Sequence, residues 1–226
     1  PQPSSLMNLH SNSTILFIGD SITDASRDLS GEAAAWLPHF GLGQGYVSQV
    51  WAWLTATHPE LRLRVVNKGV SGNTVRDLSG RWQQDVLDLN PDVLCVMIGI
   101  NDVWRQFDAP SSPAPIITPE EFRETLARLV AEAGATVSAL YLATPFFLEP
   151  NREEPMRKRM DEYGCIVREL AEARKAVFVD VQAAFDRVMD ALHPSALAWD
   201  RIHPGPHGHM VIARAFLQAF GVLKHS

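Results

Sequence analysis

The chain has 226 residues, of which 46% are hydrophobic and 20% are charged, proportions that are typical of one globular domain. Lys and Arg number 20 against 26 Asp and Glu, and the resulting net charge of −6 argues against a nucleic-acid partner. The longest aliphatic run covers only residues 93–98, whereas a membrane-spanning helix needs about 20 apolar residues. The composition therefore excludes a transmembrane protein and disfavours a nucleic-acid-binding one.

The amino-terminal segment and the cysteines bear on where the protein works. Residues 1–13 are polar and lack the apolar stretch of a signal peptide, so we expect a flexible extension and a cytoplasmic protein. The two cysteines are Cys95 and Cys165. Both lie in apolar or helical surroundings, and we expect two buried thiols in a reducing compartment, with no disulfide between them.

Short apolar segments alternate along the chain with longer segments of helical periodicity. In chain order, we predict strands at 14–18, 61–66, 93–98, 136–143 and 176–179. We predict helices at 45–57, 74–89, 118–133, 156–175, 182–192 and 207–220. Arginines alternate with apolar residues in 61–66, which predicts a strand with one solvated face or a strand at the edge of the sheet. The proline-rich residues 109–119 are predicted to form a loop within one domain, with a linker between two domains as the alternative. This alternation predicts one α/β domain over residues 1–226, with a parallel sheet between helices on both faces.

Four polar segments lie at the positions where such a fold is expected to carry its functional residues. Ligands of parallel α/β sheets bind at the carboxyl ends of the strands. Residues 19–23 (Gly-Asp-Ser-Ile-Thr), 67–74 and 99–102 (Gly-Ile-Asn-Asp) follow the first three predicted strands, and 200–204 (Asp-Arg-Ile-His-Pro) precedes the last helix. We therefore expect the four segments to meet at one edge of the sheet.

Ser21, His203 and Asp200 have the side chains that nucleophilic catalysis needs. A serine hydroxyl is a weak nucleophile without a base, and an imidazole, with an ordinary pKa of ~6.5, accepts and returns a proton at neutral pH. Asp200 is three residues before His203, so its carboxylate can orient the imidazole and stabilise the imidazolium. Considered singly, Ser21 and Asp200 are also explained as helix caps, and His203 as an ordinary loop residue.

Hydrogen-bond donors for the tetrahedral anion of an attacked ester are present in the same segments. The candidates for this oxyanion hole are the backbone N–H groups of Ser21 and Gly72 and the side-chain amide of Asn101. A glycine at position 72 permits close approach and a positive φ. Considered singly, Gly72 is also explained by an ordinary turn, and Asn101 as a loop cap.

Together the four segments resemble the GDSL or SGNH hydrolase superfamily, whose sequence blocks occur here in the same order from Gly19 to His203. Within it, residues 65–69, 71–78, 98–105 and 197–201 look most like the intracellular acetylxylan (xylo-oligosaccharide) esterases. Ile22 stands where the family name has leucine. The resemblance implies a flavodoxin-like three-layer α/β/α sandwich with strand order 2-1-3-4-5, no cofactor, and a homo-oligomer. It also implies the catalytic and oxyanion roles named above for Ser21, Asp200, His203, Gly72 and Asn101.

Other residues near these segments have more than one interpretation. His203, His207 and His209 suggest a metal site. No carboxylate or cysteine has a spacing that would make it a further ligand beside them, so we expect no metal. Asp20 resembles the strand-end carboxylate of a phospho-acceptor or Mg²⁺ site, but the second acidic residue of such sites is missing. Because they adjoin the site segments, Asp20, Trp104 and Trp199 are our candidates for binding the substrate.

These observations predict a serine esterase that removes acetyl groups from a carbohydrate, and acetylated xylo-oligosaccharides are the expected substrates. Two alternatives on the same fold are a lipolytic esterase or thioesterase and a non-catalytic carbohydrate-binding protein. A neutral sugar ester suits an acidic protein, because such a substrate needs no electrostatic attraction to reach the site.

Overall fold

The computed structural model describes residues 9–28, 40–108 and 116–224. Its parallel sheet consists of β1 (Thr14–Gly19), β2 (Arg64–Gly69), β3 (Val93–Met97), β4 (Ala139–Ala143) and β5 (Val177–Val179). The strand order is β2-β1-β3-β4-β5, which confirms the predicted flavodoxin-like arrangement. β2 lies at one edge, which is one of the two positions that the alternating arginines of 61–66 allowed.

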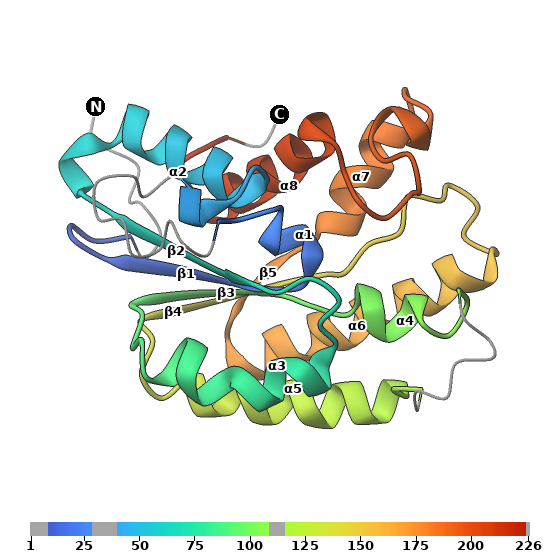
Figure 1. Cartoon of the computed structure of the whole chain (residues 1–226), viewed down its shortest axis with the longest axis horizontal. Helices are drawn as coiled ribbons and strands as arrows, with labels where there is room; N and C mark the ends of the chain where they lie inside the picture. Colours follow the sequence, from blue (N-terminus) through green and yellow to red (C-terminus); the bar gives the residue numbers. More distant parts are fainter. Residues whose placement is uncertain (1–8, 29–39, 109–115, 225–226) are drawn as a thin grey trace.

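Helices cover both faces of the sheet (Figure 1). One layer holds α2 (Tyr46–Thr57), α7 (Val181–Met189) and α8 (Pro206–Ala219), and the other holds α3 (Val75–Trp82), α5 (Pro119–Ala133) and α6 (Pro155–Arg174). Two short helices, α1 (Ser21–Asp24) and α4 (Ile100–Trp104), directly follow β1 and β3. The predicted three-layer sandwich is confirmed. Within the described residues, no helix combines the length and the apolar character that crossing a membrane requires.

The core lies on both faces of the central strands. β3 and β4 are buried at every position, because helices cover both of their faces, and this is why they read as unbroken apolar runs. On β1, the ring of Phe17 packs edge-on against Tyr46 of α2, against Phe216 of α8 and against Phe220, which directly follows α8. This aromatic cluster holds the carboxyl-terminal end of α8 on β1.

The strand register brings the predicted site segments together. Gly19, the last residue of β1, is paired with Gly69 at the end of β2 and with Met97 at the end of β3. The residues that follow these three strands therefore leave the sheet side by side at its carboxyl edge. The predicted convergence of the first three segments is a direct result of this register.

Two predicted strands begin later than expected. β2 starts at Arg64, because Pro59–Leu61 forms a 3-10 turn that ends in Arg62 with a φ of +46°. β4 starts at Ala139, because the chain before it is still in the turn that closes α5. The predicted helix 74–89 is α3 followed by a π-helical turn, Gln83–Leu87.

Two expectations about single segments need correction. The predicted flexible extension does not reach residue 13, because Leu9 is buried in the core and the N–H of Asn12 donates to Leu61. Residues 1–8 lie outside the described residues, as do residues 109–115 of the predicted proline-rich loop. Cys95 is buried as expected, but Cys165, on α6, is exposed.

Candidate active site

Ser21 begins α1 at the point where β1 ends. The glycine before it is required by space, because a Cβ on Gly19 would lie 2.2 Å from the carbonyl oxygen of Met97. Asp20 caps α1, and its Oδ1 accepts the N–H of Ile22 at 3.0 Å. The turn directs the Ser21 hydroxyl into a cavity of about 570 Å³ at the sheet edge.

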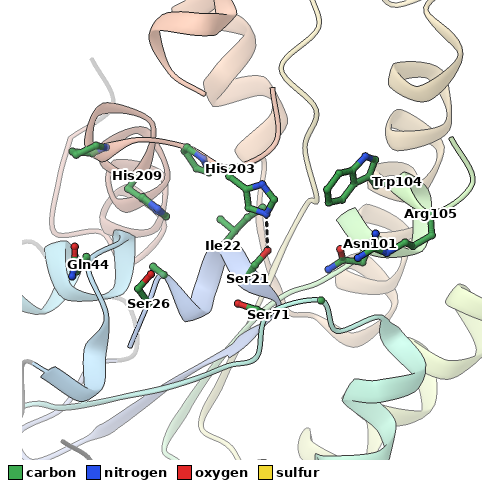
Figure 2. A pocket seen from close by; sticks show the side chains of 14 residues that line it. Ser21, Ile22, Ser26, Gln44, Ser71, Asn101, Trp104, Arg105, His203 and His209 are labelled. Carbon is green, nitrogen blue, oxygen red and sulfur yellow. Dashed lines mark hydrogen bonds between the residues drawn. The ribbon is translucent and has the colours of Figure 1, made fainter. Parts of the chain in front are cut away.

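Ser21, His203 and Asp200 form a continuous chain of hydrogen bonds, and Figure 2 shows the bond between Ser21 and His203. Ser21 Oγ lies 3.1 Å from His203 Nε2, and His203 Nδ1 lies 2.6 Å from Asp200 Oδ2. The other carboxylate oxygen, Oδ1, accepts the backbone N–H groups of Ile202 at 2.9 Å and His203 at 2.8 Å. The turn that carries both residues therefore holds the carboxylate and the imidazole in a fixed relation.

The environment of Asp200 sets the state of the imidazole. Burial raises the pKa of Asp200, but hydrogen bonds from the His203 side chain and from two backbone N–H groups outweigh it and place the pKa below its ordinary value. An ionised carboxylate only accepts hydrogen bonds, so the proton of a neutral His203 ring is on Nδ1. Nε2 then has its lone pair free for the proton of the Ser21 hydroxyl, which is the arrangement that general-base activation needs.

The predicted oxyanion donors lie beside Ser21. Gly72 and Asn101 line the same cavity as Ser21 and His203. Gly72 has a φ of +82° with open space around it, so its backbone conformation, not crowding, favours glycine there. Asn101 Nδ2 donates to the carbonyl of Asn73 at 2.9 Å, which anchors the amide while its second proton stays available. The structure thus brings all three predicted donors to one place.

Arg81, which the sequence analysis did not identify, joins these segments. From α3, its guanidinium donates to the carbonyl oxygens of Gly19 at 2.8 Å and Lys68 at 2.7 Å, at the ends of β1 and β2. It also donates to Asn73 Oδ1 at 2.6 Å and to Asp85 at 2.9 Å. One side chain therefore fixes the ends of two strands against the loop of residues 70–74.

Asp102, next to Asn101, is a buried carboxyl group with one unpaired oxygen. Its Oδ1 accepts the N–H of Val75, at the start of α3, at 3.0 Å, while Oδ2 has no partner among the described residues. Burial raises the pKa of Asp102 to about 7. Burial also raises the pKa of Asp20 to about 7, with a further contribution from the charge of Asp102. Ionising these two carboxyl groups above neutral pH therefore lowers the stability of the folded state.

The three candidate substrate-binding residues occupy different places. Trp104 lines the cavity, and its ring packs edge-on against the His203 ring with 5.8 Å between centroids. Asp20 is 1% exposed, because its carboxylate caps α1 beneath Ser21, so the structure does not support substrate binding by Asp20. Trp199 is 84% exposed and is not among the residues that line the cavity, so its assignment stays a prediction. Of the three, Trp104 is the one that lines the cavity with Ser21.

The histidines that follow His203 have separate environments. His207 is exposed near the start of α8, whereas His209 is buried and its Nδ1 accepts the N–H of Tyr46 at 3.2 Å. Across residues 9–28, 40–108 and 116–224, no group of three His, Cys, Asp or Glu side chains is placed to hold a metal ion. His209 nevertheless lines the cavity, together with Ser26, Gln44, Ser71 and Arg105, which the sequence analysis did not assign to the site.

Comparison with known proteins agrees with this geometry. The profile of the GDSL-like Lipase/Acylhydrolase family matches residues 17–211. The chain belongs to this family. An acetylxylan esterase of Geobacillus stearothermophilus is 50% identical over 217 residues, which cover 95% of this chain and 97% of that protein. As the resemblance implied, the chain is a carboxylic ester hydrolase.

Solved structures of similar sequence share the fold. LAE5, an alpha/beta hydrolase enzyme from the metagenome of Lake Arreo, is 52% identical, with a TM-score of 0.92 over 97% of this chain and 100% of its own. Axe2, an acetylxylan esterase of Geobacillus stearothermophilus, is 50% identical, with a TM-score of 0.90 over 95% of this chain and 97% of its own. Axe2 forms described as catalytic mutants have alanine in place of a serine, a histidine or an aspartate. These are the residue types that meet at Ser21, His203 and Asp200.

We predict that Arg81→Met lowers kcat by about ten- to hundredfold and changes KM by less than about threefold, because a displaced oxyanion donor weakens binding of the transition state more than binding of the substrate. Steady-state kinetics on an aryl acetate, at a temperature where circular dichroism shows a folded variant, measure this. Arg128→Met is the matched control, because Arg128 is an exposed arginine that binds Glu132 and Ser79 away from the cavity. An unchanged kcat in folded Arg81→Met would show that Arg81 does not position the site.

We predict that Asp102→Asn stabilises the protein increasingly as the pH rises. The pKa of Asp102 is raised from 3.8 to about 7, so the stability that its protonated form contributes is fully present below 3.8 and is lost as the pH rises through 7. Asparagine stays neutral, so the free energy of unfolding of the variant relative to the native chain rises by about 1–2 kcal/mol between pH 6 and pH 8.5. Urea unfolding at both values measures the difference, with the exposed Asp190→Asn as control. A difference that is independent of pH would contradict the prediction.

Proposed function

We propose that the protein is a serine esterase that removes acetyl groups from xylo-oligosaccharides through an acetyl-enzyme intermediate. The observation that supports it most directly is the hydrogen-bonded chain Ser21–His203–Asp200 beside the donors of Gly72 and Asn101. The name of the 50% identical relative, acetylxylan esterase, supports the choice of substrate.

In the first half of the reaction, Ser21 Oγ attacks the carbonyl carbon of the acetyl group while His203 Nε2 takes its proton. The imidazolium that forms keeps its Nδ1–H bond to Asp200, whose negative charge stabilises it. The tetrahedral intermediate then collapses. The bond between the acetyl carbon and the sugar oxygen breaks, and His203 Nε2 gives its proton to that oxygen, so the deacetylated sugar leaves as an alcohol.

The negative oxygen of the intermediate needs donors that are already in position. The N–H groups of Ser21 and Gly72 and the free Nδ2 proton of Asn101 supply them, and Asn73 and Arg81 hold the loop that carries Gly72. Losing one such donor typically lowers the rate by about 10²–10³. In the second half, water attacks the acetyl-enzyme with His203 again as base, and acetate and free Ser21 result.

The polar lining of the cavity supports a hydroxylated alcohol as the leaving part of the ester, and we propose a short acyl group. Polar side chains of Ser26, Gln44, Ser71 and Arg105 line the cavity, and their groups suit sugar oxygens better than a long hydrocarbon chain. The lipolytic and thioesterase alternatives require room for a longer acyl chain at Ser21. Esters of one alcohol with acetate, butyrate and octanoate separate these possibilities, and we expect kcat/KM to fall with each longer chain.

We predict that Ser21→Ala lowers the release of acetate from acetylated xylo-oligosaccharides by about 10⁶-fold, as expected when the nucleophile of such a triad is removed. Ser195→Ala is a matched control, because Ser195 also forms a serine–histidine hydrogen bond, at 2.8 Å to His193, on the exposed surface. Undiminished release by Ser21→Ala would overturn the mechanism. A native chain that binds the saccharide but releases no acetate from any ester would favour the carbohydrate-binding alternative.

The cytoplasmic location and the homo-oligomer implied by the resemblance stay predictions. Light scattering coupled to size-exclusion chromatography measures the assembly state of the purified chain, and we expect a mass that is a multiple of 25.0 kDa.

A further inference from the structure

The catalytic cavity has a second polar wall, on the side of Ser21 that faces away from Asn101 and Trp104. Figure 2 shows His209, Gln44 and Ser26 together on this side, whereas Asn101, Trp104 and Arg105 lie on the other. None of these three side chains takes part in the proton transfers or the oxyanion binding of the proposed reaction.

The His209 imidazole is held in one orientation by its surroundings. Its Nδ1 accepts the N–H of Tyr46 at 3.2 Å, and the two rings stack with 6.4 Å between centroids and 21° between planes. A Cβ on Gly45 would lie 2.7 Å from His209 Cε1, so the absence of a side chain at Gly45 makes room for the ring. His209 is 8% exposed. Its ring is therefore a fixed part of the cavity wall.

These contacts determine what His209 offers a ligand. Because Nδ1 accepts a hydrogen bond, the proton of the neutral ring is on Nε2, and Nε2 has no hydrogen-bond partner among the described residues. Burial lowers the pKa of His209 to about 4, so the ring is uncharged at neutral pH. An uncharged N–H donor with no partner at a cavity wall suits an oxygen of a neutral molecule.

We propose that His209 Nε2–H and the side-chain amide of Gln44 form a subsite for the alcohol part of the ester, where they bind oxygens of the sugar next to the acetylated position. Gln44 is exposed and lines the same wall, so its amide can reach a second sugar oxygen. This proposal rests on the proposed function, because it assumes that the alcohol is a saccharide.

The geometry of the reaction favours this side for the sugar. The oxyanion donors draw the carbonyl oxygen toward Gly72 and Asn101, and the leaving oxygen must lie near His203 Nε2 to receive its proton. From His203, the wall continues through Pro204 and Pro206 to His209. On the opposite side, the guanidinium of Arg105 lies 5.0 Å from the centroid of the Trp104 ring and occupies one of its faces.

Two substitutions at position 209 separate the subsite from the structural role of the ring. In His209→Asn, the amide oxygen can replace Nδ1 as acceptor for Tyr46, while the donor at Nε2 is lost. In His209→Gln, the amide nitrogen reaches the place of Nε2, while the buried acceptor is lost. We expect the asparagine variant to keep its thermal midpoint and lose sugar selectivity, and the glutamine variant to lose stability and keep selectivity.

The experiment compares kcat/KM for xylose tetra-acetate with kcat/KM for phenyl acetate, whose alcohol part has no hydrogen-bond acceptor besides the ester. We expect His209→Asn to lower the value for the sugar ester about three- to tenfold, as for the loss of one hydrogen bond, and the value for phenyl acetate less than about twofold. Equal losses on both esters, or no loss on either, would overturn the proposal.

Gln44→Ala keeps the test decisive if His209→Asn does not fold. This change at an exposed position should also lower kcat/KM for the sugar ester selectively, whereas Gln218→Ala, the same change on α8 outside the cavity, should alter neither ester. Identical behaviour of the two glutamine variants would overturn the proposal. Failure of the proposed function gives a different result: the native chain would hydrolyse phenyl acetate but not xylose tetra-acetate.

Discussion

The close approach of three strand ends is the constraint on which the site depends. Gly19 is paired with both Gly69 and Met97, and a Cβ on Gly69 would lie 2.1 Å from the backbone nitrogen of Asp24 in α1. The two glycines let α1 pack directly onto the ends of β1 and β2. Ser21 therefore meets the 70–74 loop and Asn101 without any long connecting loop, and the backbone and side-chain donors around it are carried by a rigid sheet edge.

The close packing of these strand ends also buries two carboxyl groups. Asp20 and Asp102 each accept a backbone N–H at the start of a helix, α1 and α3 respectively, in a place that is 1–2% exposed. Arg81 brings a positive charge between the strand ends and lowers the pKa of Asp20 in part, but burial of the carboxyl group outweighs it. The carboxylates fix the helix starts that carry Ser21 and support Gly72, and ionising them reduces stability. The buried carboxyl groups thus hold the catalytic edge of the sheet in its geometry, and the cost is a lower stability of the fold.

Sequence reasoning identified functional residues that directly follow a strand end, but it missed residues whose role depends on contacts with distant parts of the chain. Ser21, Asn101 and the Asp200–His203 pair were predictable because their segments stand next to apolar runs or a helix start. Asp20 was misassigned because a carboxylate at a strand end can be a helix cap as well as a ligand. Arg81 and His209 act on Gly19 and Tyr46, 62 and 163 residues away, a separation that no local pattern encodes. The short helices α1 and α4 have too few residues to show a period.

His203 and His209 show how contacts at one ring nitrogen determine the role of a histidine. Both belong to the segment that enters α8 and both line the cavity. The Nδ1 of His203 faces the carboxylate of Asp200, which stabilises the ring when it gains a proton at Nε2. The Nδ1 of His209 faces the N–H of Tyr46, so protonating that nitrogen would break the bond and place a charge in a buried site. One ring is therefore built to move protons and the other to stay a neutral donor, which separates chemistry from recognition within residues 203–209.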